Sequence, residues 1–446
     1  MPLPPLVSAS LPAPPGPYRV GYAPISHFPI SSFSHPHPTH IDTGKPALQI
    51  QQVGYSVFYP CSSESRGWLG SRGGKGVSWV PDPFWGVVRG YEKFLGAKGM
   101  KWLAGAIGYI AGRIKMPVYS LAPLLPPPTH KYPLVIFSHG LAGTRHTYSQ
   151  YCSALASEGY VVLAVEHRDG SGPAVCMPAQ EGDKGGGEGR VMYYIKQTDL
   201  VWPSGQDKSL THFRTLQLDL RTHEIYEAYY SFKRLLTTAD AGVKVEGLDG
   251  EKRKEWVGSL QGKVDWEELR LTGHSFGGGT LLHLLSTPSP DTANLPPLPV
   301  KQAVALDPWL DPIPVPSDKM DPSSPLPPLL VLNSTGFTEW SVHFDRLMKM
   351  VKKANGSLIT VNGAGHQSFS DFPLLNPATQ SSAQLLLTKF DVMSQAFFKR
   401  ELHSCPDVQG KTPDDGKFER DADGRSMKIK KEGKVGEAVV HILGQE

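Results

Sequence analysis

The sequence has little of what marks several common protein classes. Its 446 residues include four cysteines, which are widely spaced and form no C-x-x-C pair (Cys61, Cys152, Cys176 and Cys405). This spacing is atypical of a disulfide framework and suits reduced thiols in an intracellular protein. No apolar run approaches the roughly 20 residues that a membrane-spanning helix requires, so we expect no transmembrane segment.

Charge of one sign is also scarce. The chain has 45 Lys and Arg against 42 Asp and Glu, a formal net charge of +3. Nucleic-acid binding would require a larger and clustered basic excess, so we expect no nucleic-acid partner. The first residues, from Met1 to Pro5, lack the charged and apolar regions of a secretory signal, and Pro2 excludes N-myristoylation. We therefore expect a cytoplasmic protein that attaches to membranes at most peripherally.

Glycine and proline, by contrast, are abundant, with 46 and 41 residues. Residues 1–45 are rich in proline, serine and histidine and predict a disordered extension. Residues 405–446 are strongly charged and predict a loose C-terminal tail. The intervening residues 46–404 are expected to form one domain, with loop-like insertions near 170–206 and 311–328.

Several short apolar runs predict the strands of a central sheet. They cover residues 133–137, 160–165, 303–306, 329–332 and 358–361. Continuous apolar runs separated by helical stretches are typical of a parallel sheet that is buried on both faces. We therefore predict an α/β fold with a mostly parallel sheet and helices on both faces. In such folds the site lies at the carboxyl ends of the strands.

The most informative motif is G-x-S-x-G, at residues 273–277. A strand-like stretch precedes it at 269–272, and a helix-like apolar stretch follows at 280–285. A strand, a tight turn and a helix form a nucleophile elbow, which exposes the hydroxyl of its serine. The alternative is a chance match in a glycine- and serine-rich chain, and the flanking elements argue against it. Ser275 is therefore the predicted nucleophile.

A serine nucleophile requires a base and an acid, which in this fold class follow it in the order acid, then histidine. Asp307 follows the run at 303–306, and His366 follows the run at 358–361. We predict His366 as the general base and Asp307 as the carboxylate that orients it. Asp311 is an alternative acid four residues later, and Asp371 is a weaker one because it comes after the histidine.

Other polar residues have predicted supporting or structural roles. The N–H of Phe276 and one N–H from the loop at 138–143, for which we choose Leu141, are expected to form the oxyanion hole. His139 and His167 also end strands, but a structural role is the more common fate of such histidines. His274 is expected to pack or cap within the elbow. We predict neither a cofactor nor a metal.

Five motifs in order resemble the platelet-activating factor acetylhydrolases of the plasma and intracellular monomeric type, as a fungal-like or otherwise divergent member. They are the segments FSHGL (137–141), EHRD (166–169), GHSFGG (273–278), ALD (305–307) and HQSFSDF (366–372). The resemblance covers roughly residues 50–400. It implies an α/β-hydrolase fold and calcium-independent cleavage, through an acyl-enzyme, of the sn-2 ester of glycerophospholipids with short or oxidised acyl chains. It also implies the triad Ser275, Asp307 and His366, with oxyanion donors at Leu141 and Phe276.

A lipid substrate raises the question of how the protein would reach a membrane or micelle surface. Residues 94–115 place Leu103, Ile107 and Ile110 on one helical face, with Trp102 beside it and basic residues around it. Such a helix suits the plane of a membrane surface. A helix that packs in the core is the alternative.

Two other functions remain open at this point. A general carboxylesterase of the same fold would prefer small soluble esters. A lipid-binding protein that has lost catalysis would be expected to lack one member of the triad, and all three are present in this sequence.

Overall fold

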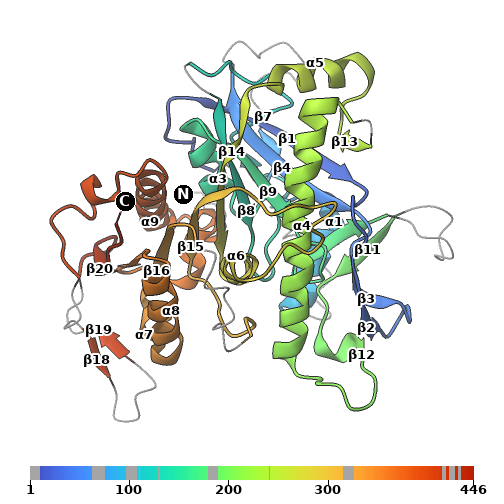
Figure 1. Ribbon diagram of the computed structural model, residues 1–446. Coiled ribbons are helices and arrows are strands. Elements are labelled where there is room, and N and C mark those ends of the chain that lie inside the picture. The colour runs from blue at the N-terminus through green and yellow to red at the C-terminus, as the bar shows by residue number, and fades with distance from the viewer. Residues whose placement is uncertain are drawn as a thin grey trace, which may run out of the picture.

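One mixed sheet runs through the computed structural model, and helices cover both of its faces (Figure 1). The structure describes residues 11–62, 76–96, 108–109, 111–128, 131–178, 189–240, 242–314, 326–413, 418–420, 427–429 and 433–445. In spatial order the sheet contains β13 (Val243–Val245), β1 (Arg19–His27), β4 (Val53–Cys61), β9 (Val161–Glu166), β8 (Tyr132–Ser138), β14 (Val264–His274), β15 (Val300–Leu306), β16 (Leu329–Ser334), β17 (Ser357–Val361) and β20 (Ala438–Ile442).

The central strands, from β9 to β17, are all parallel to their neighbours. Antiparallel strands complete the sheet, with β4, β1 and β13 on one side and β20 on the other. β7 (Tyr119–Ser120) pairs with β1. The five apolar runs in the sequence correspond to β8, β9, β15, β16 and β17. The predicted α/β-hydrolase fold with a mostly parallel sheet is therefore confirmed.

Helices cover the sheet in two layers (Figure 1). Their bounds are α1 (Phe84–Phe94), α3 (Ser149–Ser157), α4 (Leu210–Thr238), α5 (Gly250–Leu260), α6 (Phe276–Ser286), α7 (Thr335–Glu339), α8 (Ser341–Lys353) and α9 (Gln380–Phe398). Successive residues of a strand point to opposite faces. In β8, Leu134 and Ile136 join the core beneath α4, α5, α6 and α8, whereas Val135 and Phe137 join the core beneath α3 and α9. This two-sided burial explains why the central strands are continuously apolar.

Smaller sheets of two or three strands lie outside the main sheet. They are β2 (Ser34–His40), β3 (Pro46–Gln49) and β12 (Leu200–Val201); β5 (Val77–Ser78) with β6 (Lys115–Met116); β10 (Ala174–Met177) with β11 (Arg190–Tyr193); and β18 (Phe418–Arg420) with β19 (Met427–Ile429). The predicted insertion at 170–206 therefore contributes β10, β11 and β12, and β10 packs against α1. Of the insertion predicted at 311–328, residues 315–325 lie outside the described part of the chain.

The prediction that residues 1–45 are disordered is wrong for residues 11–45. β1 lies inside the main sheet and pairs with β4 along its whole length, and β2 belongs to a small sheet with β3. Tyr22, Ala23 and Ile25 are buried. Gly21 lies so close to the ring of Tyr59 that a Cβ atom would come within 2.4 Å of it. The proline-rich composition concealed a strand whose stability comes from its partners.

The prediction of a loose C-terminal tail is also wrong for the last strand. β20 pairs antiparallel with β17 and closes that edge of the sheet. Ala438, Val439 and Val440 are buried there. A short apolar run within a charged segment is therefore enough to form an edge strand when a partner is available.

The proposed membrane-contact residues Trp102, Leu103, Ile107 and Ile110 all lie outside the described residues. At the two ends of that segment, Leu95 is strongly exposed and Ile114 is buried. No helix in the described ranges is both long enough and apolar enough to cross a bilayer.

Candidate active site

Ser275 lies at the sharp turn between β14 and α6. Its backbone has φ 56° and ψ −118°, a conformation that is rare for a residue with a side chain. The glycines on either side are required by close approach: a Cβ atom on Gly273 would lie 2.8 Å from the backbone of Gly277, and one on Gly277 would lie 2.0 Å from the carbonyl oxygen of Ser138. The strand, turn and helix that the G-x-S-x-G motif predicts are all present.

Three distant residues meet at this turn. His366 begins the 3-10 helix η4 (His366–Phe369), and Asp307 directly follows β15. His366 Nε2 lies 2.9 Å from Ser275 Oγ, and His366 Nδ1 lies 3.0 Å from Asp307 Oδ2. Because an ionised carboxylate can only accept, Nδ1 carries the proton and Nε2 accepts from the serine hydroxyl. This is the hydrogen-bond pattern of a Ser–His–Asp triad.

The Asp307 carboxylate is fully buried and fixed from a second direction. The backbone N–H of Ser334 donates to Oδ1 and its hydroxyl donates to Oδ2, each at 2.5 Å. Burial raises the pKa of Asp307, whereas the hydrogen bonds from His366 and Ser334 oppose that rise. Ser334 therefore helps to hold both the orientation and the charge of this carboxylate.

Aromatic rings enclose the His366 imidazole. The ring of Phe337 stacks on it at 4.5 Å with an interplanar angle of 3°, and the ring of His274 lies 4.5 Å away. Burial and the nearby His366 hold the pKa of His274 well below its ordinary value, so His274 is neutral. Its Nδ1 lies 2.8 Å from the hydroxyl of Tyr148. His274 thus packs within the elbow, as expected.

Neither alternative acid pairs with His366. Asp311 is exposed. Asp371 is buried at the start of α3, where it accepts from the hydroxyl and N–H of Ser149 and from Trp79 Nε1. Burial raises the pKa of Asp371 to about 7. Asp371 therefore caps a helix and lies apart from the triad.

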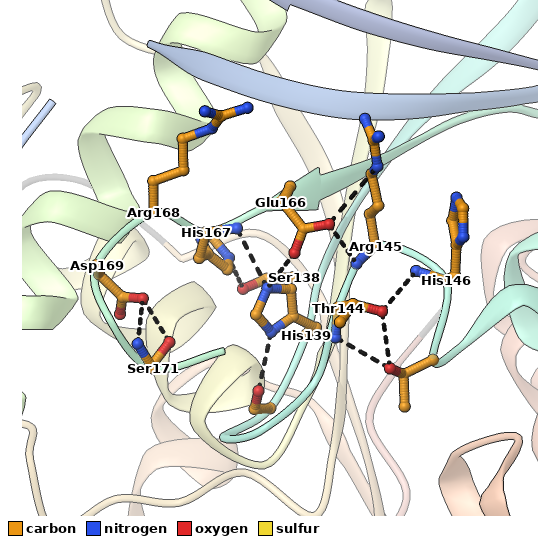
Figure 2. A network of polar contacts seen from close by, with 12 residues as sticks. Ser138, His139, Thr144, Arg145, His146, Glu166, His167, Arg168, Asp169 and Ser171 are labelled. Carbon is orange, nitrogen blue, oxygen red and sulfur yellow. Dashed lines mark hydrogen bonds and ion pairs between the residues drawn. The ribbon is translucent and has the colours of Figure 1, made fainter. Parts of the chain in front are cut away.

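His139 and His167 belong to a buried network of polar contacts (Figure 2). The Nδ1–H of His139 donates to the carbonyl of Gly140, and its Nε2 accepts from the N–H of His167. Burial and the nearby Arg221 lower the pKa of His139 to about 3. His167 bridges Ser138 Oγ and Glu224 Oε2, at 2.7 Å each. These contacts match the structural role expected for both histidines.

The loop after β8 passes beside Ser275. A Cβ atom on Gly140 would lie 3.1 Å from the Cβ of Ser275. The N–H of Ala142 donates to the carbonyl of Ser171 at 2.8 Å, which holds the loop in place. Within the described part of the chain, neither Leu141 N–H nor Phe276 N–H donates a hydrogen bond. Neither N–H is therefore engaged by an acceptor among the described residues.

A cavity of about 690 Å³ opens over these residues. Aromatic side chains from several elements line it, among them Phe94, Trp309, Phe337, Trp340 and Phe372, and Leu141 lies in its wall. Among the described residues that line it, none is Asp, Glu, Lys or Arg. Its size is typical of small-molecule sites, and its wall suits an apolar substrate.

His274, Asp307 and His366 also place one donor atom each within 4.8 Å of one another, close enough to contact a single ion. However, both nitrogens of His366 and both carboxylate oxygens of Asp307 already take part in hydrogen bonds within the site. An ion would have to displace these bonds.

Sequence reasoning missed Ser334, Phe337 and Tyr148. Ser334 ends β16, at the same sheet edge as Asp307, so the argument that selected Asp307 and His366 applied to it as well. Phe337 and Tyr148 carried no comparable signal, because their roles depend on which ring they meet across the fold.

Comparison with known proteins agrees with this geometry. A family model described as platelet-activating factor acetylhydrolase, isoform II, matches residues 7–403. The chain belongs to the platelet-activating factor acetylhydrolase family. The resemblance drawn from five motifs is thereby confirmed.

Individual members of the platelet-activating factor acetylhydrolase family are moderately similar to the chain. The acetylhydrolase of Gallus gallus is 30% identical over 311 residues, which cover 67% of this chain and 65% of that protein. The one from Bos taurus is 31% identical over 305 residues, which cover 66% and 59%. The matches thus span less than two thirds of these relatives' own lengths.

A solved structure shares the fold. The ferulic acid esterase from Streptomyces cinnamoneus aligns with a TM-score of 0.53 and 18% identity, over 95% of this chain and 99% of that one. At this identity the likeness concerns the fold alone.

Proposed function

We propose that this protein is a serine hydrolase that cleaves carboxylic esters through an acyl-enzyme on Ser275. The observation that carries the proposal is the hydrogen-bonded convergence of Ser275, His366 and Asp307, with Ser275 and His366 in the lining of an apolar cavity. The same three residues lie in three of the motifs that resemble the acetylhydrolase family.

In the first step, His366 Nε2 takes the proton of Ser275 as Oγ attacks the ester carbonyl. Asp307 stabilises the imidazolium that forms. The N–H groups of Leu141 and Phe276 receive the oxyanion of the tetrahedral intermediate. His366 then gives its proton to the leaving alcohol, and a water molecule, activated by the same base, hydrolyses the acyl-enzyme.

For the substrate, we propose the sn-2 ester of glycerophospholipids with short or oxidised acyl chains. Family membership and the apolar cavity support this assignment. Because protein groups fill the roles of nucleophile, base and oxyanion donors, we propose that the reaction needs no calcium.

A screen of phosphatidylcholines that differ only in the sn-2 chain, from acetyl to palmitoyl, tests the substrate in calcium-free buffer. We expect turnover to be fastest with the short chains. A fluorophosphonate should label Ser275 alone, and Ser275→Ala should remain folded without turnover. Labelling of another residue, or turnover by the alanine variant, would refute the mechanism.

A general carboxylesterase is the second candidate, and the cavity wall favours it in one respect. The described lining contains no Lys or Arg that could bind a phosphate group. The two candidates differ in their response to lipid aggregation: a phospholipase accelerates when its substrate forms micelles, whereas an esterase for soluble esters does not. The third possibility, an inactive lipid-binding protein, is disfavoured by the intact triad geometry.

We also propose that Trp102, Leu103, Ile107 and Ile110 contact the lipid surface. Phe94 and Leu95 support this, because both line the cavity and expose apolar surface to solvent just before that segment. A Trp102→Asp, Ile107→Asp variant should sediment less with liposomes while keeping its activity on a soluble ester. Unchanged sedimentation of the folded variant would refute the contact.

A further inference from the structure

Arg221 is a fully buried arginine in the middle of α4, and all of its guanidinium nitrogens are engaged. Nε donates to Asp169 Oδ2 at 2.7 Å, Nη1 to the carbonyl of His139 at 2.7 Å, and Nη2 to Ser171 Oγ at 2.6 Å. None of these partners belongs to the triad. All of them belong to two chain segments that follow β8 and β9.

These bonds fix the chain before and after the peptide of Leu141. The His139 carbonyl lies just before Gly140 and Leu141 in the chain. Ser171 lies behind the other end of the loop, where its carbonyl accepts from the N–H of Ala142 at 2.8 Å. Asp169 accepts from the N–H and the hydroxyl of Ser171, as Figure 2 shows. Arg221 therefore donates hydrogen bonds to residues at both ends of the loop that carries Leu141, namely His139 and Ser171.

The same guanidinium group also touches the other proposed donor residue. Its central carbon lies 4.4 Å from the centroid of the Phe276 ring, a cation–π distance. The Phe276 side chain is fully buried. Phe276 is the first residue of α6 and directly follows Ser275. One side chain thus contacts the structural supports of both Leu141 and Phe276.

We propose that Arg221 is the positioning residue that fixes the two oxyanion donors, Leu141 N–H and Phe276 N–H, relative to each other. This inference rests on the proposed ester hydrolysis. Arg221 acts through geometry, because its charge is already matched by the buried carboxylate of Asp169. Burial disfavours ionisation of that carboxylate, yet Arg221 and Ser171 together hold its pKa below the ordinary value.

Lysine cannot take over this role. An ammonium group is a point donor on a flexible stem, whereas the planar guanidinium holds three acceptors in a fixed fork and stacks on an aromatic face. Arg221→Lys preserves the positive charge and removes the planar guanidinium that binds the three acceptors. A displacement of the donors weakens binding of the transition state more than binding of the ester substrate.

The test compares Arg221→Lys with Arg214→Lys on a short aryl ester. Arg214 is an equally buried arginine of α4, but it contacts Gln217 and Tyr194. For Arg221→Lys we expect kcat to fall about 10²-fold with KM changed less than about twofold. The inhibition constant of a trifluoromethyl ketone, which mimics the tetrahedral intermediate, should rise by a similar factor. Arg214→Lys should keep kcat within about threefold.

Several outcomes would overturn the proposal: wild-type kcat in folded Arg221→Lys, a loss confined to KM, an unchanged inhibition constant, or an equal loss in Arg214→Lys. If Arg221→Lys shows no cooperative melting, Ser171→Ala serves as the test instead. It removes the hydroxyl that accepts from Arg221 Nη2 and keeps the carbonyl that accepts from the N–H of Ala142. It should lower kcat about tenfold, and wild-type kcat there would refute the inference. A wild-type protein that hydrolyses no ester would instead refute the proposed function itself.

Discussion

The molecule contains two hydrogen-bonded Ser–His–carboxylate arrangements. In the first, His366 joins Ser275 at 2.9 Å and Asp307 at 3.0 Å. In the second, His167 joins Ser138 and Glu224 at 2.7 Å each. Judged by these distances, the second is the tighter of the two.

Their surroundings differ in every other respect. Ser275 borders the cavity, and a third of the His366 side chain is exposed. Ser138 is the last residue of β8, and Ser138, His167 and Glu224 are all buried. Burial and the nearby Arg221 hold the pKa of His167 well below its ordinary value, and burial raises that of Glu224 well above its own.

On the proposed function, this difference separates a reactive serine from a structural one. A general base must become positively charged during the reaction, and the dry interior around His167 opposes that charge. The Ser275 arrangement also has a strained turn that presents the hydroxyl, and the proposed oxyanion donors, the N–H groups of Leu141 and Phe276, make no hydrogen bond among the described residues. Hydrogen-bond distances alone therefore do not identify the active site.

The largest expected effect concerns activity. His366→Ala should lower kcat by about 10⁴-fold or more, because the base is lost. His167→Ala should leave kcat of the folded protein within about tenfold of wild type, because its side chain only supports the interior. Ester turnover and fluorophosphonate labelling measure both. A folded His167→Ala protein that fails to label would contradict the distinction.

For stability the order should reverse. His167→Ala leaves Ser138 Oγ and Glu224 Oε2 unpaired in a dry site and opens a cavity, at a cost of about 3–5 kcal/mol in the free energy of unfolding. His366→Ala removes a partly exposed ring and should cost no more than about 1 kcal/mol. Urea unfolding of both variants gives the comparison. Equal losses would contradict the expectation that the buried arrangement contributes more stability than the one around Ser275.

Much of the fold was predictable, because central parallel strands carry their own signal. Buried on both faces, β8, β9 and β15 are apolar throughout and stand out from the sequence. β1 and β20 do not, since antiparallel strands near a sheet edge depend on a partner that no local pattern reveals. This is why residues 11–45 and the last strand, β20, were misjudged.

The candidate site likewise contains residues that the sequence predicts and residues that it does not. Ser275, Asp307 and His366 could be predicted because each follows a parallel strand, and the carboxyl ends of such strands share one edge of a sheet. Arg221 could not, because nothing about a residue in the middle of a long helix indicates which carbonyl oxygens its side chain will meet.

A smaller effect, on the pH dependence of stability, should come from Glu166, which lies beside His139 in the buried network (Figure 2). Burial raises the pKa of Glu166 from 4.5 to about 7, although Arg145 opposes the rise. Because the folded-state pKa is the higher one, the stability linked to this carboxyl is present below about pH 4.5 and is lost as pH rises through about 7.

Glu166→Gln, which is uncharged at every pH, should remove this part of the pH dependence, on the order of 2 kcal/mol between pH 5 and pH 8. Asp371 has a similarly raised pKa and remains in both proteins, so the measurement is the difference between the two slopes. Urea unfolding at several pH values supplies it. Identical slopes would show that Glu166 is ionised throughout, and kcat should be little changed.

The smallest effect compares one hydroxyl from each arrangement. Ser334→Ala removes the hydroxyl that donates to Asp307 Oδ2 and keeps the backbone N–H on Oδ1. A hydrogen bond to a charged group contributes about 1.5 kcal/mol, so kcat should fall about tenfold. Ser138→Ala removes an equally buried hydroxyl from His167 and should change only the free energy of unfolding, by about 1–2 kcal/mol. If Ser138→Ala lowered kcat as much as Ser334→Ala does, the two arrangements would be coupled and the proposed division between a reactive and a structural serine would fail.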